Sequence, residues 1–206
     1  MARGVNRKAN KDLNSRRVQI IRAAAGLFVR KGILGTTVRE IARASGITVG
    51  TLYHYINTKT DIISLILEEE LDVINDFIRE GGDLLLQVGP VEALHQAIDR
   101  YFRVVAEIQD LTLFWYQETR NLLPTQRKKV LAYEYLFAET FNKILVAGCK
   151  SGHFRDHDTL LMSHNIIVLG DMWAFRRWFL HKHYTLAQYT REQIELILSR
   201  ICNDRP

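Results

Sequence analysis

Apolar residues recur along the chain every three or four positions, which is the spacing of one face of an α-helix. In the range 15–31 this face holds Val18, Ile21 and Phe28, and Gly32 follows as a stop signal. The same criterion predicts further helices, with breaks at Gly, Pro and Asn, over 38–45, 49–55, 60–80, 90–108, 110–122, 125–149, 158–180 and 187–203. The pattern therefore predicts an all-α fold of nine helices.

The two short helices flank Gly46 and have the pattern of a helix-turn-helix. The turn needs a residue that tolerates positive φ, which Gly46 supplies, and the helix crossing needs a small side chain, which Ala42 supplies. Apolar residues stand where they can hold the two helices together, namely Val38, Ile41, Ile47 and Leu52, with Tyr55 on the far side. In such a pair the second helix enters the major groove of DNA.

The basic charge of the chain is concentrated in its first third. Residues 1–60 hold twelve Lys and Arg against two acids, a formal charge of +10, whereas residues 61–206 hold sixteen bases and twenty-one acids, a charge of −5. A basic module of this kind is expected to meet phosphates. Residues 1–14 are polar and basic, and we expect them to form a flexible arm.

The second short helix carries small and hydroxyl-bearing residues where it would face DNA. Gly50 adds no bulk, so the backbone can approach the groove, and Thr51 can contact a base or a thymine methyl group. Tyr53 and His54 suit phosphate oxygens, as does Lys59 before the next helix. The predicted DNA-binding residues are Thr36, Thr37, Arg39, Thr48, Val49, Gly50, Thr51, Tyr53, His54 and Lys59.

The segment GTTVREIARASGITVGTLYHYINTKTDII resembles the DNA-binding segment of the TetR family of bacterial transcriptional regulators. The matching positions are Thr36, Thr37, Gly46, Tyr53, Tyr55 and Lys59, while Ile56 stands where many members have phenylalanine. The resemblance implies a nine-helix homodimer. It also implies a three-helix DNA-binding domain, here 15–60, and a helical ligand-binding and dimerisation domain, here 61–206.

Two aromatic stretches are candidates for an effector pocket in the second domain. LTLFWYQETRNLL and GDMWAFRRWFLHKHY each combine aromatic rings with arginine, which suits an apolar pocket beside an anion partner. The candidate residues are Phe114, Trp115, Glu118, Met172, Trp173, Arg176 and Arg177. Plain core packing is the alternative for both stretches. The C-terminal part resembles family members that sense acyl-coenzyme A thioesters, and a lipophilic drug, as in repressors of efflux pumps, is the other effector class.

The last predicted helix has an apolar stripe that needs a partner surface. Together with the 158–180 helix it would form a four-helix bundle across a two-fold axis. The predicted dimer residues are Leu161, Ile194, Ile197, Leu198 and Ile201. Packing within one protomer is the alternative.

Other function classes find little support in the sequence. It lacks G-x-S-x-G, Walker and Rossmann motifs, and its two cysteines form no zinc pattern, so we expect neither an enzyme nor a cofactor or metal site. It also lacks a signal peptide and an 18-residue apolar run, so we expect a cytoplasmic protein without membrane contact. Together with the helix-turn-helix pattern, the resemblance to the TetR family implies a repressor that a small effector releases from a palindromic double-stranded DNA operator.

Overall fold

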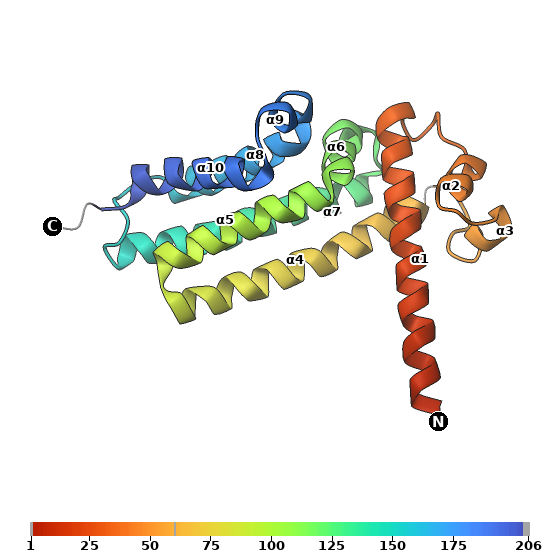
Figure 1. Ribbon diagram of the computed structural model, residues 1–206, viewed down its shortest axis with the longest axis horizontal. Helices are drawn as coiled ribbons and strands as arrows, with labels where there is room; N and C mark the ends of the chain where they lie inside the picture. The colour runs from red at the N-terminus through yellow and green to blue at the C-terminus, as the bar shows by residue number, and fades with distance from the viewer. Residues whose placement is uncertain (1, 60, 204–206) are drawn as a thin grey trace. The chain divides into compact units, whose positions relative to one another are not determined.

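The computed structural model describes the backbone of residues 2–59 and 61–203, and the side chains of that range other than those of 2–15 and 69–73. Its helices are shown in Figure 1. They are α1 Ala2–Lys31, α2 Val38–Ala44, α3 Val49–Leu52, α4 Asp61–Val88, α5 Pro90–Glu107, α6 Gln109–Glu118, the 3-10 helix η1 Thr119–Asn121, α7 Pro124–Lys150, α8 Thr159–Phe175, α9 Arg177–His183 and α10 Leu186–Ile201. Extended pairing within the described residues is limited to one isolated bridge between Phe154 and Cys202. The all-α prediction is confirmed.

The described residues form eleven helices instead of nine because two predicted helices are interrupted: the 110–122 range divides into α6 and the 3-10 helix η1, and the 158–180 range divides into α8 and α9. The 158–180 range divides at Arg176, whose φ of −109° and ψ of 26° are not helical, into α8 and α9. No glycine or proline marks this break. At this bend the guanidinium of Arg176 lies 5.0 Å from the ring centroid of Trp178, which is within the range of a cation–π contact.

Helix α4 continues beyond Glu80, where we expected it to end at Gly81–Gly82. A Cβ atom at Gly81 would lie 2.7 Å from Cγ2 of Thr140 in α7. Gly81 thus permits close approach of another helix and does not stop its own. Thr60, at the expected start of this helix, lies outside the described residues, and Asp61 is the first residue of α4.

Helix α1 begins at Ala2, so most of the segment that we expected to be a flexible arm is helical. Arg, Lys, Ala and Leu are good helix formers, and the amphipathic 15–31 stretch provides a helix on which preceding residues can propagate. Met1 and the side chains of 2–15 lie outside the described residues.

The chain forms two compact units. Unit 1 comprises residues 1–71 and 113–130, and unit 2 comprises 72–112 and 131–206. In unit 1, α1 packs against α2, and α2 against α3. Each of these helices contributes a large side chain with no exposed surface, namely Phe28, Ile41 and Leu52. Burying side chains of this size contributes roughly 1.5–3 kcal/mol each.

In unit 2, α5 packs against both α8 and α10. An aromatic cluster fills the interior, with the ring of Phe77 5.2 Å from that of Phe137 and 6.1 Å from that of Tyr101. Gly170 of α8 allows the close approach to α5, because a Cβ atom there would lie 2.6 Å from the Tyr101 ring. Among the described residues, no helix combines the length and the apolar character that crossing a bilayer requires.

Candidate functional site

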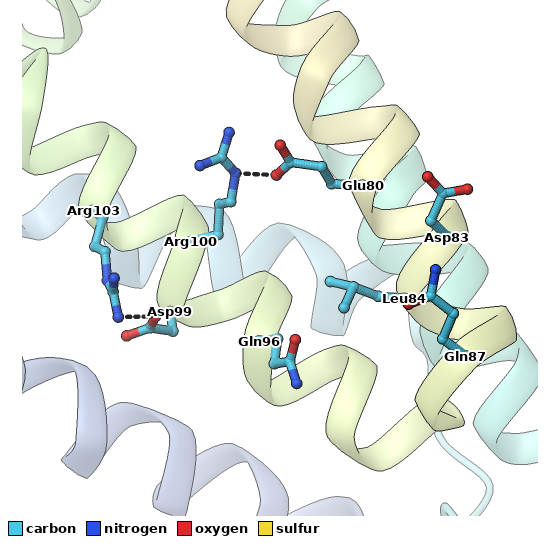
Figure 2. Close-up of a pocket in the computed structure, with 8 residues that line it drawn as sticks. All are labelled: Glu80, Asp83, Leu84, Gln87, Gln96, Asp99, Arg100 and Arg103. Carbon is cyan, nitrogen blue, oxygen red and sulfur yellow. Dashed lines mark ion pairs between the residues drawn. The ribbon is translucent and has the colours of Figure 1, made fainter.

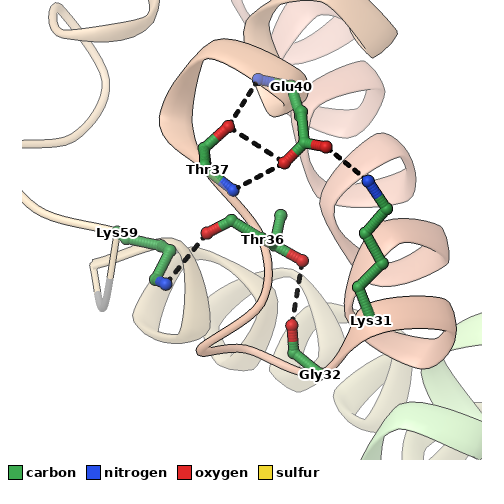
Figure 3. Close-up of polar contacts among 6 residues, drawn as sticks. All are labelled: Lys31, Gly32, Thr36, Thr37, Glu40 and Lys59. Atoms are coloured by element: carbon green, nitrogen blue, oxygen red, sulfur yellow. Dashed lines mark hydrogen bonds and ion pairs between the residues drawn. The ribbon is translucent and has the colours of Figure 1, made fainter.

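The entry to α2 is fixed by a capping box. Thr37 is the N-cap residue, its hydroxyl oxygen accepts a hydrogen bond from the Glu40 backbone N–H, and the Glu40 carboxylate accepts one from the Thr37 N–H at 2.9 Å. Figure 3 shows that Lys31 reaches the same carboxylate. The Lys31 ammonium and the Thr37 donors lower the pKa of Glu40 to about 2. The start of α2 is thereby held in one geometry at neutral pH.

Lys59 is engaged with the loop between α1 and α2. Its Nζ donates to the carbonyl oxygen of Thr36 at 2.9 Å, as Figure 3 shows, and to that of Leu34 at 3.4 Å. The Thr36 side chain is buried, and its hydroxyl donates to the Gly32 carbonyl oxygen at 2.9 Å. The prediction of a DNA contact is therefore corrected for the Thr36 side chain, because its hydroxyl faces the interior. A lysine ammonium has three protons, so Lys59 can still donate to a phosphate.

The turn and the short helix α3 have the geometry of a helix-turn-helix. Gly46 has a φ of +66°, as the turn requires. Thr48 is the N-cap of α3: its Oγ1 accepts from the Thr51 N–H at 3.1 Å and lies 2.9 Å from the Thr51 hydroxyl oxygen. Leu52 and Ile56 are buried beneath this segment and hold it against the unit 1 core.

Most of the predicted DNA-binding side chains lie at the surface. Those with exposed or half-exposed residues are Thr37, Arg39, Thr48, Val49, Gly50, Thr51, Tyr53, His54 and Lys59. Tyr55 is half-buried, so it is neither a fully buried core residue nor a fully exposed one. The exposed set offers hydroxyl, imidazole, guanidinium and backbone groups, which are the donors that proteins use toward phosphates and base edges.

Three predicted effector residues belong to unit 1. Phe114 and Trp115 are buried, with ring centroids 4.7 Å apart, and Phe114 also lies 5.4 Å from Phe28 of α1. Glu118 is half-exposed and accepts a hydrogen bond from the Asn121 side chain at 3.1 Å. The two rings therefore belong to the same core as the DNA-binding helices.

The other predicted effector residues belong to unit 2, and they do not share one environment. Trp173 is buried, with its ring 4.3 Å from that of His181 and 5.5 Å from that of Tyr189, whereas Met172 is half-buried. Arg176 and Arg177 are exposed, and Arg177 pairs with Asp110 at 3.1 Å. Trp173 thus follows the core-packing alternative, and both arginines have partners within the chain.

A polar pair that the sequence patterns above do not indicate lies inside the aromatic core of unit 2. The Tyr101 hydroxyl donates to Oδ1 of Asp171 at 2.9 Å. Burial, reinforced by the nearby charge of Glu134, raises the pKa of Asp171 to about 7 although the Tyr101 hydrogen bond lowers it. The signal that could have found this pair is an aspartate within the otherwise apolar stretch IIVLGDMWAF. Near neutral pH, Asp171 can act as a donor or as an acceptor.

A cleft of about 540 Å³ lies between α4 and α5 in unit 2, as Figure 2 shows. Arg100 pairs with Glu80 across the cleft, and Arg103 pairs with Asp99 of its own helix at 2.6 Å. The remaining lining residues are Asp83, Leu84, Gln87 and Gln96. None of the predicted effector residues lines this cleft, and its two guanidinium groups are neutralised by carboxylates.

The predicted dimer residues fall into two groups. Leu161 is exposed and Leu198 is half-exposed, whereas Ile194, Ile197 and Ile201 are buried within their own protomer. The three isoleucines therefore follow the alternative of packing within one protomer. Further apolar side chains are exposed on the same two helices, at Leu160, Val168 and Leu196.

Two models of known protein families match this chain, one over the DNA-binding segment and one over the C-terminal part. A family model described as bacterial regulatory proteins, tetR family, matches residues 20–66. A model described as tetracyclin repressor-like, C-terminal domain, matches residues 87–200, more than half of the chain. The chain belongs to the TetR family of bacterial regulatory proteins. The first match spans the helix-turn-helix, and the second spans α5 to α10.

Similar TetR-family proteins include regulators of known name. The HTH-type transcriptional regulator HbdR of Aromatoleum sp. (strain CIB) is 30% identical over 186 residues, covering 90% of this chain and 80% of that regulator. The ketosteroid transcriptional regulator KstR2 of Mycobacterium tuberculosis has a TM-score of 0.77 at 25% identity, covering 93% and 97% of the two chains. FadR of Bacillus subtilis, solved with stearoyl-CoA, has a TM-score of 0.67 at 26% identity, covering 88% and 97%.

Proposed function

We propose that this protein is a homodimeric transcriptional repressor that binds operator DNA and leaves it when a coenzyme A thioester binds. The observation that carries the first half is the exposed surface of α3 and its flanks on a strongly basic module of a TetR-family chain. Such a surface places short polar side chains where a major groove presents base edges. The protein acts by binding and not by catalysis, in the cytoplasm where the chromosome is accessible.

In the proposed complex, the exposed residues divide their roles by position. Gly50 and Thr51 approach base edges, while Tyr53, His54 and Lys59 hold phosphates on either side. The Lys59 ammonium donates a hydrogen bond to the Thr36 carbonyl oxygen in the loop before α2. With its remaining protons it can also donate to a phosphate of the DNA backbone while it keeps that hydrogen bond. Two such modules in a two-fold dimer read a palindrome.

The effector class is supported by similarity and by the chemistry of the interior. FadR of B. subtilis, of which this chain covers nearly the whole length, was solved with stearoyl-CoA. In this chain, the buried Trp173 ring of α8 offers apolar surroundings for an acyl group in unit 2, the unit that also contains Arg177. Arg177, exposed and paired only at the surface with Asp110, can exchange that carboxylate for a phosphate of coenzyme A.

A mobility-shift titration with operator DNA tests this proposal. Stearoyl-CoA is expected to release the complex, whereas matched concentrations of stearate and of free coenzyme A release it poorly. Arg177→Ala should keep its operator affinity and need at least about tenfold more thioester, because a charge-assisted contact to a phosphate is lost. Equal release by stearate would remove the thioester from consideration and favour a lipophilic ligand without a nucleotide.

A further inference from the structure

A second cleft of unit 2, of about 420 Å³, lies where α9 meets α10. It is lined by the exposed rings of Phe179 and Tyr184 and by the buried ring of Tyr189. The centroid of the Tyr189 ring lies 5.5 Å from that of Trp173. The other lining residues are Leu180, Gln188, Arg191, Glu192 and Gln193. All of them belong to one unit, so the cleft is complete within unit 2.

One side chain of this cleft has an amide oxygen without a hydrogen-bond partner. Gln193 is half-exposed and lines the cleft, but its Oε1 is buried and has no partner among the described residues. Most buried polar atoms in proteins have such a partner. Because this oxygen has no hydrogen bond to lose, the amide can rotate toward the cleft without breaking one there. It then offers a ligand both an acceptor and donors.

The charges around the cleft favour an anionic ligand. Arg176, Arg177 and Lys182 are exposed cations of α9 and its N-cap, a segment that contains no acid. The acid in the cleft lining, Glu192, pairs with the neighbouring Arg191 at 3.3 Å. Guanidinium groups match the geometry of phosphates, so the cleft combines aromatic rings, a free amide and cations suited to phosphate. These are the groups that recognise a nucleotide.

We propose that this cleft binds the adenine base of the coenzyme A effector, with Phe179 stacked on the base and Gln193 paired with its edge. Aromatic side chains stack on bases, and a glutamine amide accepts from adenine N6 and donates to N7. Guanine has an acceptor in place of the N6 donor and would leave Gln193 Oε1 unpaired.

The inference rests on the proposed function, because it assigns the residues that recognise the nucleotide of the thioester. Gln193 becomes a specificity-determining residue, and the cations of α9 lie in the same segment as Phe179, where the phosphates of the nucleotide would follow the base. Tyr189, in contact with Trp173, joins this cleft to the apolar surroundings proposed for the acyl group.

The test compares two ligands that differ at one position of the base. Stearoyl-CoA and its hypoxanthine analogue, in which an oxygen replaces the N6 amino group, are titrated against the wild-type protein by calorimetry. The wild type should bind the adenine ligand about tenfold more tightly, because hypoxanthine presents two acceptors and leaves the amide oxygen unpaired.

Three variants locate the effect. Gln193→Leu removes the amide and should bind both ligands with equal affinity. Gln87→Leu, at an exposed glutamine of α4, should keep the tenfold preference. Phe179→Ala should remain dimeric and bind both ligands at least about tenfold more weakly, because the stacking surface is lost.

The outcomes separate this inference from the proposed function. Equal binding of the two ligands by the wild type, or an undiminished preference in Gln193→Leu, overturns the adenine site and leaves the thioester as effector. A monomeric Phe179→Ala protein with unchanged ligand affinity would show that the cleft is a contact between protomers, which overturns the inference too. If stearoyl-CoA neither binds the wild type nor releases operator DNA, the proposed function fails, and this inference fails with it. The wild-type comparison requires no variant, so it decides the question even if Gln193→Leu does not fold.

Discussion

Two polar residues of unit 1 show that a sequence indicates which groups a side chain offers, but not which groups in the folded chain that side chain contacts. Lys59 and Thr36 were both expected to meet DNA. The structure engages Lys59 with loop carbonyl oxygens and turns the Thr36 hydroxyl into the core. Both residues thus stabilise the loop that presents α2, whatever else they contact. An ammonium group has protons to spare for DNA, whereas a buried hydroxyl does not.

Lys59→Met should therefore lower the stability of the protein as well as its DNA affinity. Losing the ammonium leaves the carbonyl oxygens of Leu34 and Thr36 without this donor, for an expected loss of about 1 kcal/mol. Urea unfolding measures this change. Lys128→Met, at an exposed site of the same unit, controls for the loss of a charge. If Lys59 contacts a phosphate, its replacement should also reduce the salt dependence of operator binding by about one unit per protomer, because one phosphate contact is lost. Unchanged stability would contradict the role of Lys59 in the loop.

Asp171 makes a prediction about pH. The folded chain holds its pKa at about 7, above the ordinary value of 3.8, so the folded state binds more protons than the unfolded state between those values. The contribution of Asp171 to the free energy of unfolding is thus most favourable below pH 4, and it is lost as the pH rises toward 7. Asp171→Asn can still accept from Tyr101 and cannot ionise. Relative to wild type, the free energy of unfolding of this variant should rise by on the order of 4 kcal/mol between pH 4 and 8, since a pKa difference of one corresponds to about 1.4 kcal/mol.

Chemical unfolding at several pH values measures this difference. The groups that act on Asp171 are the Tyr101 hydroxyl of α5 and the Glu134 carboxylate of α7, whose own charge is affected by His164 of α8. Asp83→Asn, at an exposed site of α4, should leave the pH profile unchanged. A difference between Asp171→Asn and wild type that does not vary with pH would show that Asp171 does not titrate in this range.

At the scale of elements, local signals predicted the helix-turn-helix well. The capping residues Thr37 and Thr48 and the positive φ of Gly46 are where the sequence indicates them, because caps and turns depend on a few adjacent residues. The end of α4 and the break before α9 were predicted wrongly. Gly81 lies close to Thr140 of α7, a helix far away in sequence, so its role depends on packing. The bend at Arg176 has no glycine or proline that would mark it in the sequence.

The two glycines of the helix-turn-helix should behave in opposite ways when replaced by alanine. At Gly50 a Cβ atom would meet only Thr48 Oγ1 at 3.8 Å, an ordinary contact, so Gly50→Ala should fold with equal or slightly greater stability. Its operator affinity should fall at least about tenfold, because the new methyl group occupies space that a close DNA backbone or base would need. Thermal unfolding and a mobility-shift assay measure the two effects.

Gly46→Ala provides the contrast. Its φ of +66° strains an alanine, so this variant should lose about 1 kcal/mol of stability, and its DNA affinity should fall only as far as its folded fraction does. If Gly50→Ala bound the operator like the wild type, the backbone of α3 would not approach DNA closely. The proposed docking would then require a different face of the module.

At the scale of the whole molecule, the sequence and the structure divide the chain differently. The sequence predicts a boundary after residue 60, whereas unit 1 also includes residues 113–130. A linear division cannot anticipate this arrangement, because it depends on contacts such as Phe28 with Phe114, which are far apart in sequence. The effector candidates Phe114 and Trp115 thereby join the unit that holds the DNA-binding helices.

The dimer is the remaining property of the whole molecule, and its interface can be tested at exposed leucines. Leu160 and Leu161 of α8 and Leu196 of α10 are each more than half exposed, and surface of this kind is expected to be covered by a second copy in a family of two-fold regulators.

Leu161→Glu places a charge in the proposed interface and should convert the dimer to a monomer in sedimentation equilibrium. Operator affinity should fall more than about a hundredfold, because the monomer loses the second half-site. Leu86→Glu, at a still more exposed leucine of α4, should remain dimeric and bind normally. A Leu161→Glu protein that stays dimeric and protects both halves of a palindrome in footprinting would place the interface elsewhere.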